Sequence, residues 1–310
     1  MKNNPTILYI CKGWIHLCYA VWSIRSLQIF DYKHIEVIVS NKKERSFFQA
    51  RFPDIVCNIL NVDTTGYPSF SYKPFVLKNY LNNKNFQNSG RDIVVCDADI
   101  LWKADPKALF RRINGKIWAQ KITAIDPNDY LASKEDISPI NIGLLTIKNY
   151  ESRFQIDSFP SYRVNAGLFQ ITSDLFKIVI DNWMEKINSL PGNEMLMSEA
   201  LLSLTMAELG LKPYCDKEDI KFFGVHESTS SLKVKHFCQL DKKRCDLTGY
   251  QIAKHYYSDQ RSQLHRDAIK NGFDSDGLIW IIRLNLLKKF LLSIHKLPMR
   301  ALKKIRRIYF

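Results

Sequence analysis

The sequence predicts an α/β fold in which a mixed, mostly parallel sheet is flanked by helices and followed by a C-terminal amphipathic helical tail. Three observations support this fold class. Short, almost wholly apolar segments alternate with amphipathic or charged ones through the first hundred residues. The apolar segments lack polar alternation, which is typical of parallel strands covered on both faces. The chain has 310 residues, of which 46% are hydrophobic, enough for a sizeable core.

The first half reads as a regular alternation of elements. Thr6 to Cys11 is an apolar run, the segment at 35–40 is rich in β-branched residues, and Pro74 occupies a favoured first-turn position for a helix. We expect strands at 6–11, 35–40, 55–62 and 92–96, and helices at 14–30, 42–52 and 73–81.

The second half is less regular. We expect strands at 141–147 and 166–171, and helices at 173–187 and 193–209, the second with Asn193 before it and Gly210 after it. Short strands and loops follow over 212–277. The predicted organisation is one domain at 1–277, divided into two halves (1–103 and 104–277), and then the tail at 278–310.

The positive charge is concentrated near the C-terminus. The formal net charge is +14, yet no acidic residue follows Asp276. Nine basic residues do follow it, leaving about +5 on residues 1–276, an ordinary value for a body of that size. They are Arg283, Lys288, Lys289, Lys296, Arg300, Lys303, Lys304, Arg306 and Arg307. A basic amphipathic helix of this kind is typical of an interfacial membrane anchor, with docking on the protein body as the alternative.

The seven cysteines predict reduced thiols rather than a disulfide framework. They are scattered, odd in number and without a C-x-x-C pair. Cys238 and Cys245 with His236 do not have the spacing of a zinc site, and a fourth ligand is missing. The N-terminal apolar run is too short for a signal peptide, and no stretch of 18 uncharged apolar residues occurs. These features predict a cytoplasmic protein without a membrane span.

The strongest chemical signal is Asp97-Ala98-Asp99, directly after the apolar run Ile93 to Cys96. Two like charges in an apolar setting are costly to desolvate unless a cation neutralises them. At the carboxyl end of a parallel strand, hard oxygen ligands favour Mg²⁺ or Mn²⁺. The alternative is structural: Asp97 pairs with a nearby Lys or Arg, and Asp99 caps the following turn. A second triplet, Asp274-Ser275-Asp276, lies in a polar context that needs no cation.

The segment RDIVVCDADILWKADPKALF, which contains this triplet, resembles the metal-binding strand of GT-A glycosyltransferases that use nucleotide-diphosphate sugars. The resemblance is nearest to glycosyltransferase family 8 and related bacterial surface-polysaccharide transferases. Three further segments are similar to the family and in its order: SYKPFVLKNYL (71–81), YRVNAGLFQI (162–171) and MSEALLSLTMAELG (197–210). The chain departs from the family in having no clear H-x-x-G-x-x-K-P-W segment near its C-terminus.

The resemblance implies a Rossmann-like GT-A catalytic domain at 1–277, with a nucleotide-binding half (1–103) and an acceptor half (104–277). It also implies a set of site residues. It implies Asp97, Asp99 and His255 as metal ligands, with His236 as the competitor of His255. It implies donor contacts from Lys73, Ala98, Asn165, Ala166, Gly167 and Lys254, and catalytic roles for Glu199 and Asn165. Glu199 could orient the acceptor, act as general base in an inverting reaction or stabilise charge in a retaining one.

The function that the resemblance implies is a metal-dependent hexosyltransferase-type glycosyltransferase. The expected donor is a nucleotide sugar, first of all a UDP-sugar, and the expected acceptor a glycan or lipid-linked molecule in bacterial surface polysaccharide or lipopolysaccharide synthesis. We expect the protein at the inner face of the cell membrane, held peripherally through 278–310. The alternative is a protein that binds nucleic acid or a membrane surface on an inactive GT-A-like scaffold. Nucleic acid is not the expected partner, because the surplus charge lies on the tail.

Overall fold

A computed structural model of the chain describes residues 4–12, 14–60, 72–82, 91–102, 104–113, 117–124, 162–189, 197–212, 220–222 and 234–236. All of them belong to the first of two units into which the chain divides, residues 1–238. The second unit, 239–310, lies outside the described residues, and so do the predicted tail and the predicted strand at 141–147. The predicted domain boundary at 277 therefore stays a prediction.

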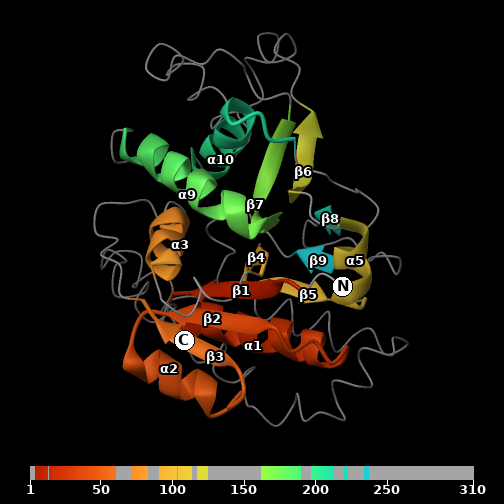
Figure 1. The fold of residues 1–310 in the computed structure, drawn as a ribbon. Helices are drawn as coiled ribbons and strands as arrows, with labels where there is room; N and C mark the ends of the chain where they lie inside the picture. The colour runs from red at the N-terminus through yellow and green to blue at the C-terminus, as the bar shows by residue number, and fades with distance from the viewer. Residues whose placement is uncertain are drawn as a thin grey trace, which may run out of the picture. The chain divides into compact units, whose positions relative to one another are not determined.

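The central feature is a six-stranded mixed sheet in the order β3-β2-β1-β4-β7-β6. Strands β1 (Thr6–Cys11), β2 (Ile35–Val39), β3 (Val56–Ile59) and β4 (Ile93–Cys96) are parallel to their neighbours within this group. Strands β7 (Tyr162–Ile171) and β6 (Trp118–Ala124) complete the sheet in antiparallel pairings. The expectation of a mixed, mostly parallel sheet is confirmed, and both predicted halves contribute strands to it (Figure 1).

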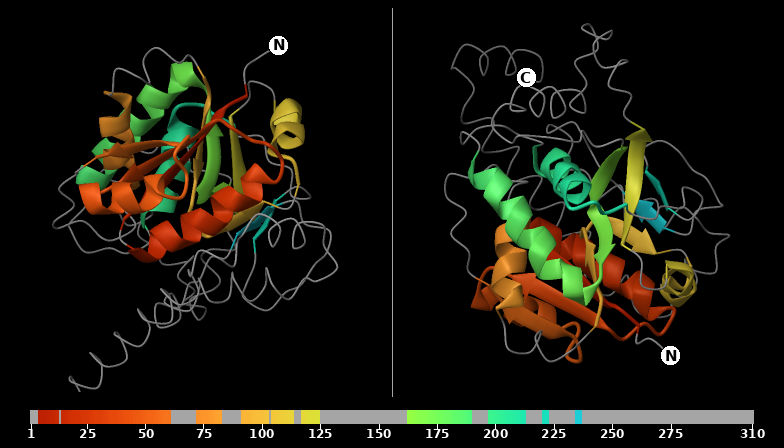
Figure 2. Two further views of the ribbon diagram at one scale, coloured as in Figure 1. Left: turned by 90° about the horizontal axis from the view of Figure 1, so that it is seen from below. Right: turned by 45° about the horizontal axis from the view of Figure 1, so that its top comes forward.

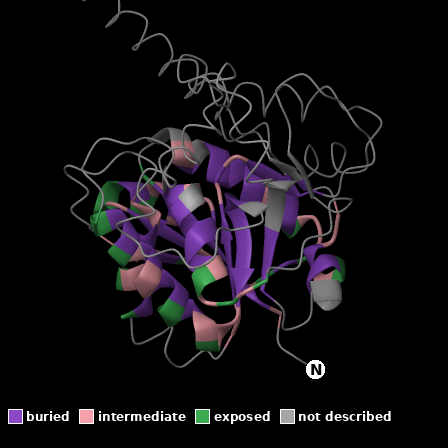
Figure 3. Ribbon diagram, turned by 90° about the horizontal axis from the view of Figure 1, so that it is seen from above, coloured by how far each residue is buried: buried purple, intermediate pink, exposed green. Residues whose placement is uncertain are grey.

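Burial explains why these strands are apolar along their whole length. Every residue of β1 and of β4 is buried, as Figure 3 shows for the middle of the sheet. A strand that contributes apolar side chains to both faces must be covered by helices on both faces. The uninterrupted apolar runs in the sequence are therefore a direct consequence of the position of these strands in the sheet.

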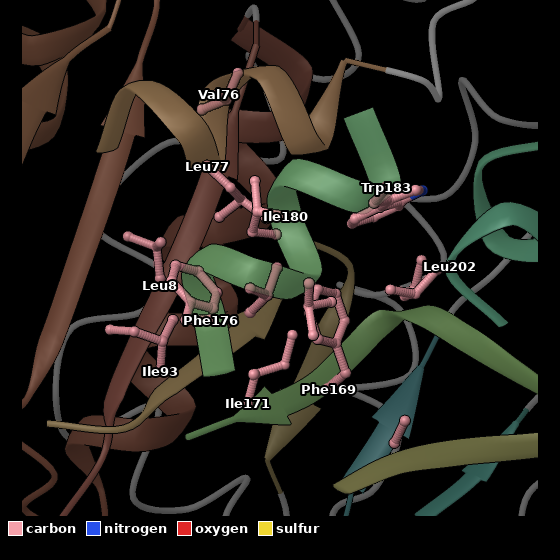
Figure 4. Close-up of a cluster of buried hydrophobic side chains, with 14 of the residues drawn as sticks. Leu8, Val76, Leu77, Ile93, Phe169, Ile171, Phe176, Ile180, Trp183 and Leu202 are labelled. Carbon is pink, nitrogen blue, oxygen red and sulfur yellow. The ribbon is translucent and has the colours of Figure 1, made fainter. Parts of the chain in front are cut away.

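Three helices cover one face of the sheet: α3 (Lys73–Leu81), α9 (Ser173–Asn188) and α10 (Met197–Glu208). Their apolar side chains join Leu8 of β1, Ile93 of β4 and Phe169 of β7 in one core cluster (Figure 4). On the opposite face lies α1 (Trp14–Gln28), where Ser23 hydrogen-bonds the Tyr9 hydroxyl across 2.7 Å. Figure 2 shows α1 along the underside of the sheet.

Helix ends are fixed by side chains near them in sequence and in space. At the start of α2 (Lys42–Gln49), the Glu44 amide donates to Asn41 Oδ1 and the Glu44 carboxylate accepts the Ser40 amide. The start of α9 is capped by a residue that is distant in sequence, because Asp92, directly before β4, accepts the Ser173 amide at 3.2 Å. Helix α10 is followed by Gly210 at φ +66, a conformation that favours glycine.

Several elements differ from the sequence-based prediction. Helix α5 (Pro106–Ile113) and strands β5 (Ile100–Trp102) and β6 were not predicted, and the strand expected at 55–62 is described as Val56–Ile59. The helix expected from Asn193 is described from Met197, since 191–196 lie outside the described residues. Strands β5, β9 (Val234–His236) and β8 (Ile220–Phe222) form a second, small sheet. Within the described ranges, no helix is long and apolar enough to cross a membrane.

Candidate active site

Four segments that are far apart in sequence meet at the carboxyl end of β4. Because β4 pairs antiparallel with β7 and Cys96 lies opposite Leu168, the residues after β4 run alongside Asn165 to Gly167. The Asp97 amide continues this pairing and donates to the Gly167 carbonyl across 2.6 Å. The start of α3 reaches the same place through Lys73, and the start of α10 reaches it through Glu199. These are the four segments that the sequence analysis singled out.

The two carboxylates of the D-x-D triplet place negative charge beside buried neutral groups. Burial raises the pKa of the Tyr72 hydroxyl, and the charges of Asp97 and Asp99 raise it further. The Cys96 thiol is also buried, which raises its pKa, and the same two carboxylates add to the effect. Tyr72 and Cys96 are therefore neutral at physiological pH. The charge of this edge therefore lies on its carboxylates and lysines and not on Tyr72 or Cys96.

Lys73 contacts the first carboxylate directly. Its Nζ lies 2.5 Å from Asp97 Oδ1 and 2.8 Å from the carbonyl oxygen of Ala166. Only 14% of the Lys73 side chain is exposed, against 31% for Asp97. The structural alternative named above, in which Asp97 pairs with a nearby Lys, is therefore present in this structure. The paired Asp97 carboxylate remains partly exposed, so a ligand can still reach it.

The Asn165 side chain is used within the protein. It is 1% exposed; its Nδ2 donates to Glu199 Oε1 at 3.2 Å, and its Oδ1 accepts the Gly167 amide at 2.7 Å. The asparagine's own amide thus bonds to the backbone within the 165–167 segment of β7. In this arrangement the side chain orients Glu199 and Gly167.

Glu199 is held at the first turn of α10 and faces β7. Its Oε1 also accepts the Ala166 amide at 3.2 Å. One turn further on, Ser203 accepts the Val164 amide at 3.0 Å and donates to the Glu199 carbonyl at 2.9 Å. These contacts fix the register of α10 against β7. The carboxylate of Glu199 is consequently tied to the same backbone segment that runs beside Asp97.

Lys12 and Tyr72 were not predicted as site residues. The Lys12 ammonium lies 5.5 Å from the centroid of the Tyr72 ring, next to the D-x-D charges that act on Tyr72. Lys12 follows β1, whose Tyr9 pairs with Cys96 of β4, so Lys12 and Asp97 leave the sheet at the same edge. The position of Lys12 directly after a predicted strand was the only sequence feature that pointed to it as a site residue. The sequence alone did not show that β1 and β4 are adjacent.

The chemistry of this edge fits a hard divalent cation. Carboxylate oxygens are the preferred ligands of Mg²⁺ and Mn²⁺, which retain open positions for water and phosphate oxygens. Among the described residues, no group of three or more His, Cys, Asp or Glu side chains could hold a metal ion. Asp97 and Asp99 could supply two carboxylates to such an ion, and a further protein ligand, water or phosphate oxygens would have to complete its coordination.

Of the two histidines predicted as candidate metal ligands, the structure describes the backbone of His236 and not His255. His255 and Lys254 lie outside the described residues, as do Cys238 and Cys245. The competitor His236 ends β9, and its backbone lies opposite Ile100, the residue after Asp99, in the antiparallel β5–β9 pair. The chain segment that contains His236 is therefore next to the acidic pair.

Neither a protein-family profile nor a curated protein matches the sequence. The fold is similar to that of the WbbM bifunctional glycosyltransferase, with a TM-score of 0.51 and 10% identity, over 87% of this chain and 52% of that one. The chain thus spans about half the length of WbbM.

Two further solved structures show weaker similarity. The galactosyltransferase LgtC, in complex with donor and acceptor sugar analogues, has a TM-score of 0.49 and 13% identity, over 83% of this chain and 96% of that one. Mouse xyloside xylosyltransferase 1 has a TM-score of 0.43 and 13% identity, over 75% and 97% of the two chains. At identities of 10–13%, structural similarity is evidence for a shared fold. The chain has the GT-A glycosyltransferase fold.

Proposed function

We propose that this protein is a metal-dependent glycosyltransferase that moves a sugar from a nucleotide-diphosphate sugar to an acceptor hydroxyl. The observation that supports this most strongly is the convergence of Asp97, Lys73, the 165–167 segment and Glu199 at one sheet edge. In α/β sheets, the carboxyl ends of strands are where ligands bind. The GT-A fold agrees with this assignment.

The proposed donor site is divided between a phosphate side and a sugar side. Asp97 and Asp99, with His255 or His236, would hold Mn²⁺ or Mg²⁺, and Lys12, Lys73 and Lys254 would offer positive charge to the diphosphate. When bound, the metal ion neutralises charge on the diphosphate leaving group. Asp97 and Ala98 would lie against the nucleotide, and the backbone of Asn165, Ala166 and Gly167 would line the sugar pocket.

The reaction breaks the bond between the sugar anomeric carbon and the phosphate oxygen and forms a bond to the acceptor oxygen, which loses its proton. Glu199 is the proposed carboxylate at this centre, because it accepts hydrogen bonds from the 165–167 segment. That segment runs next to the acidic pair. Asn165 acts on the reaction by fixing that carboxylate. Whether Glu199 accepts the proton or stabilises positive charge on the sugar depends on the stereochemical course.

For the donor and acceptor we propose a UDP-sugar and a glycan or lipid-linked acceptor of bacterial surface polysaccharide synthesis. The basic segment at 278–310 would hold the protein on the anionic inner face of the cell membrane. Deleting 278–310 is expected to abolish sedimentation with anionic vesicles and to leave donor hydrolysis in solution intact. Tight RNA binding by the truncated protein would instead favour the nucleic-acid alternative.

A screen of donor hydrolysis tests the proposed activity. Purified protein is incubated with UDP-, GDP-, ADP- and dTDP-sugars, with Mn²⁺ or with a chelator, and released nucleotide is measured. The proposal predicts Mn²⁺-dependent release from one donor class. Metal-independent release, or none from any donor with or without a mixed glycolipid acceptor, would contradict it.

The two candidate histidines are separated by matched substitutions. His236→Ala and His255→Ala are compared for the Mn²⁺ concentration that gives half-maximal hydrolysis. Substitution of the histidine that is the ligand should raise this concentration by about 10-fold or more, since the loss of even an outer-shell partner of a metal site typically costs about 10- to 100-fold in affinity. The other substitution should leave it unchanged.

A further inference from the structure

The Lys73 ammonium lies where it would interact with both a bound metal ion and a donor diphosphate. Its ammonium contacts Asp97 Oδ1 at 2.5 Å, and Asp97 is one of the two carboxylates of the proposed metal site. The inference that follows therefore rests on the proposed function. It concerns how the metal and the nucleotide depend on each other in binding.

The Lys73 ammonium is anchored independently of Asp97. It donates to the Ala166 carbonyl at 2.8 Å, and Ala166 lies in a buried strand of the central sheet. The start of α3 is also fixed, because Pro74, Val76 and Leu77 are buried. If the contact with Asp97 were lost, the Lys73 ammonium would therefore stay at this edge, next to any cation bound by Asp97.

Like charges make bare metal binding unfavourable in this arrangement. A divalent ion that binds to Asp97 and Asp99 must displace Lys73 from Asp97 or share the carboxylate with it, and the two cations repel each other at short range. A diphosphate reverses the sign of this interaction, because it supplies anionic oxygens to both cations. An ammonium has three donors, so Lys73 can reach a phosphate oxygen while it keeps the Ala166 bond.

We propose that Lys73 is a tethered cation that couples the two ligands, so that the divalent metal binds tightly only together with the nucleoside diphosphate. Lys73 disfavours the metal alone and favours the metal–diphosphate pair. By linkage, the metal raises nucleotide affinity by the same factor by which the nucleotide raises metal affinity. The site would then discriminate against free divalent ions and load the donor as a metal complex.

The test is an equilibrium titration that does not depend on turnover. Free Mn²⁺ is followed by its electron paramagnetic resonance signal, in the absence of nucleotide and at saturating UDP, with GDP, ADP and dTDP in parallel. In the wild type, nucleotide is expected to tighten Mn²⁺ binding by at least about tenfold. Lys73→Met, which keeps a side chain of similar length and removes the charge, is expected to tighten Mn²⁺ binding without nucleotide and to lower the coupling factor severalfold, leaving the part that direct contact between metal and diphosphate supplies.

Two further variants separate charge from structure. Lys73→Arg keeps the positive charge and is expected to retain most of the coupling. Lys78→Met lies on the same helix, but Lys78 pairs with Asp181 away from the acidic pair. It is expected to match the wild type in both titrations, and circular dichroism checks that each variant is folded.

The outcomes distinguish this inference from the proposed function. If the wild type shows coupling and Lys73→Met shows the same Mn²⁺ affinities and coupling as the wild type, Lys73 does not link the ligands, while the metal site stands. If the wild type binds no Mn²⁺ with any of the nucleotides, the proposed metal site is wrong and the inference is wrong with it.

Discussion

Asn165 Nδ2 donates a hydrogen bond to Glu199 Oε1 across 3.2 Å, joining a buried strand to the first turn of α10. The same carboxylate oxygen accepts the Ala166 amide, so Glu199 is oriented by two donors of one strand. The backbone beside the D-x-D residues and the proposed reaction-centre carboxylate thus form one hydrogen-bonded unit. This unit is where the structure adds most to the sequence-based account of the site.

Substituting Asn165 by Ala should impair both stability and turnover. The change removes the side-chain contacts to Glu199 and Gly167 at a position that is 1% exposed. Loss of buried hydrogen bonds costs about 1–3 kcal/mol. Urea unfolding measures the stability, and donor hydrolysis measures kcat and KM.

Glu199→Gln serves as the control for this prediction, because it keeps a side-chain oxygen that Asn165 and Ala166 can donate to. It should reduce kcat and leave stability close to that of the wild type. An Asn165→Ala protein with wild-type kcat and unfolding midpoint would contradict the positioning role.

Removing the Tyr9 hydroxyl should destabilise the fold behind the acidic pair. This buried hydroxyl bonds Ser23 Oγ at 2.7 Å and accepts Trp102 Nε1–H at 3.3 Å. Burial raises its pKa well above the ordinary value, so the group stays neutral. Tyr9→Phe should lower the free energy of unfolding by about 1–3 kcal/mol, since buried donors lose their acceptor.

Urea unfolding at neutral pH checks this, and Tyr32→Phe is the comparison. The Tyr32 hydroxyl donates to the Pro5 carbonyl, whereas the Tyr9 hydroxyl bonds both Ser23 and Trp102, so a smaller loss is expected for Tyr32→Phe. Equal stability of Tyr9→Phe and the wild type would show that the Tyr9–Ser23–Trp102 contacts contribute nothing.

The ion pair of Lys186 and Glu208 should respond unequally to substitution of its two members. Lys186 Nζ lies 2.5 Å from Glu208 Oε2, with 9% and 27% of the two side chains exposed. Glu208→Gln leaves a buried ammonium without its counter-charge and should cost about 1–3 kcal/mol, less than a fully buried pair because Glu208 is partly solvated.

Lys186→Met replaces the ammonium with an apolar group of similar length and should cost less than Glu208→Gln. Thermal or urea unfolding of the two variants gives the comparison directly. The reverse order of stabilities would mean that the lysine side chain contributes through packing more than through its charge.

Lowering the pH should reduce the stability of the protein, and His34 should contribute to this dependence. Burial lowers the pKa of His34 below its ordinary value of 6.5, and the charges of Arg91 and Lys107 lower it further. Arg91 Nη1 lies 2.9 Å from His34 Nδ1, a contact that suits the neutral ring as acceptor. As the pH falls through about 6.5, the unfolded chain therefore binds the proton first, and stability declines.

His34→Gln should flatten the dependence of unfolding free energy on pH between about pH 7 and pH 5, where histidine titrates. Unfolding in urea at a series of pH values measures this. A variant curve parallel to that of the wild type over this range would show that His34 has the same pKa in the folded and unfolded chains.

Elements with uniform patterns were predictable from the sequence. Strand β1 and helix α3 lie at their predicted bounds, because an uninterrupted apolar run and a Pro at the first turn each identify one element. Strand β6 was missed because Gln120, Lys121 and Thr123 interrupt its apolar pattern, and its register with β7 is irregular. The direction of β7 depends on its pairing with β4, which local sequence does not specify.

The site could be predicted only in part for a similar reason. Asp97 and Asp99 stand out because two charges follow a buried strand. The partner of Asp97 could not be named, since Lys73 reaches it from the start of α3, which is distant in sequence. The internal bonding of Asn165 depends on how α10 packs on β7, which only the folded arrangement shows.

The most direct test of the central claim compares the two D-x-D triplets of the chain in Mn²⁺-dependent donor hydrolysis. Asp97→Asn and Asp99→Asn should each reduce the rate by about 100-fold or more, because each removes a charged ligand oxygen of the metal. Asp274→Asn with Asp276→Asn is the matched control and should leave the rate unchanged. Full activity of the first two variants would contradict the assignment of this sheet edge as the metal and donor site.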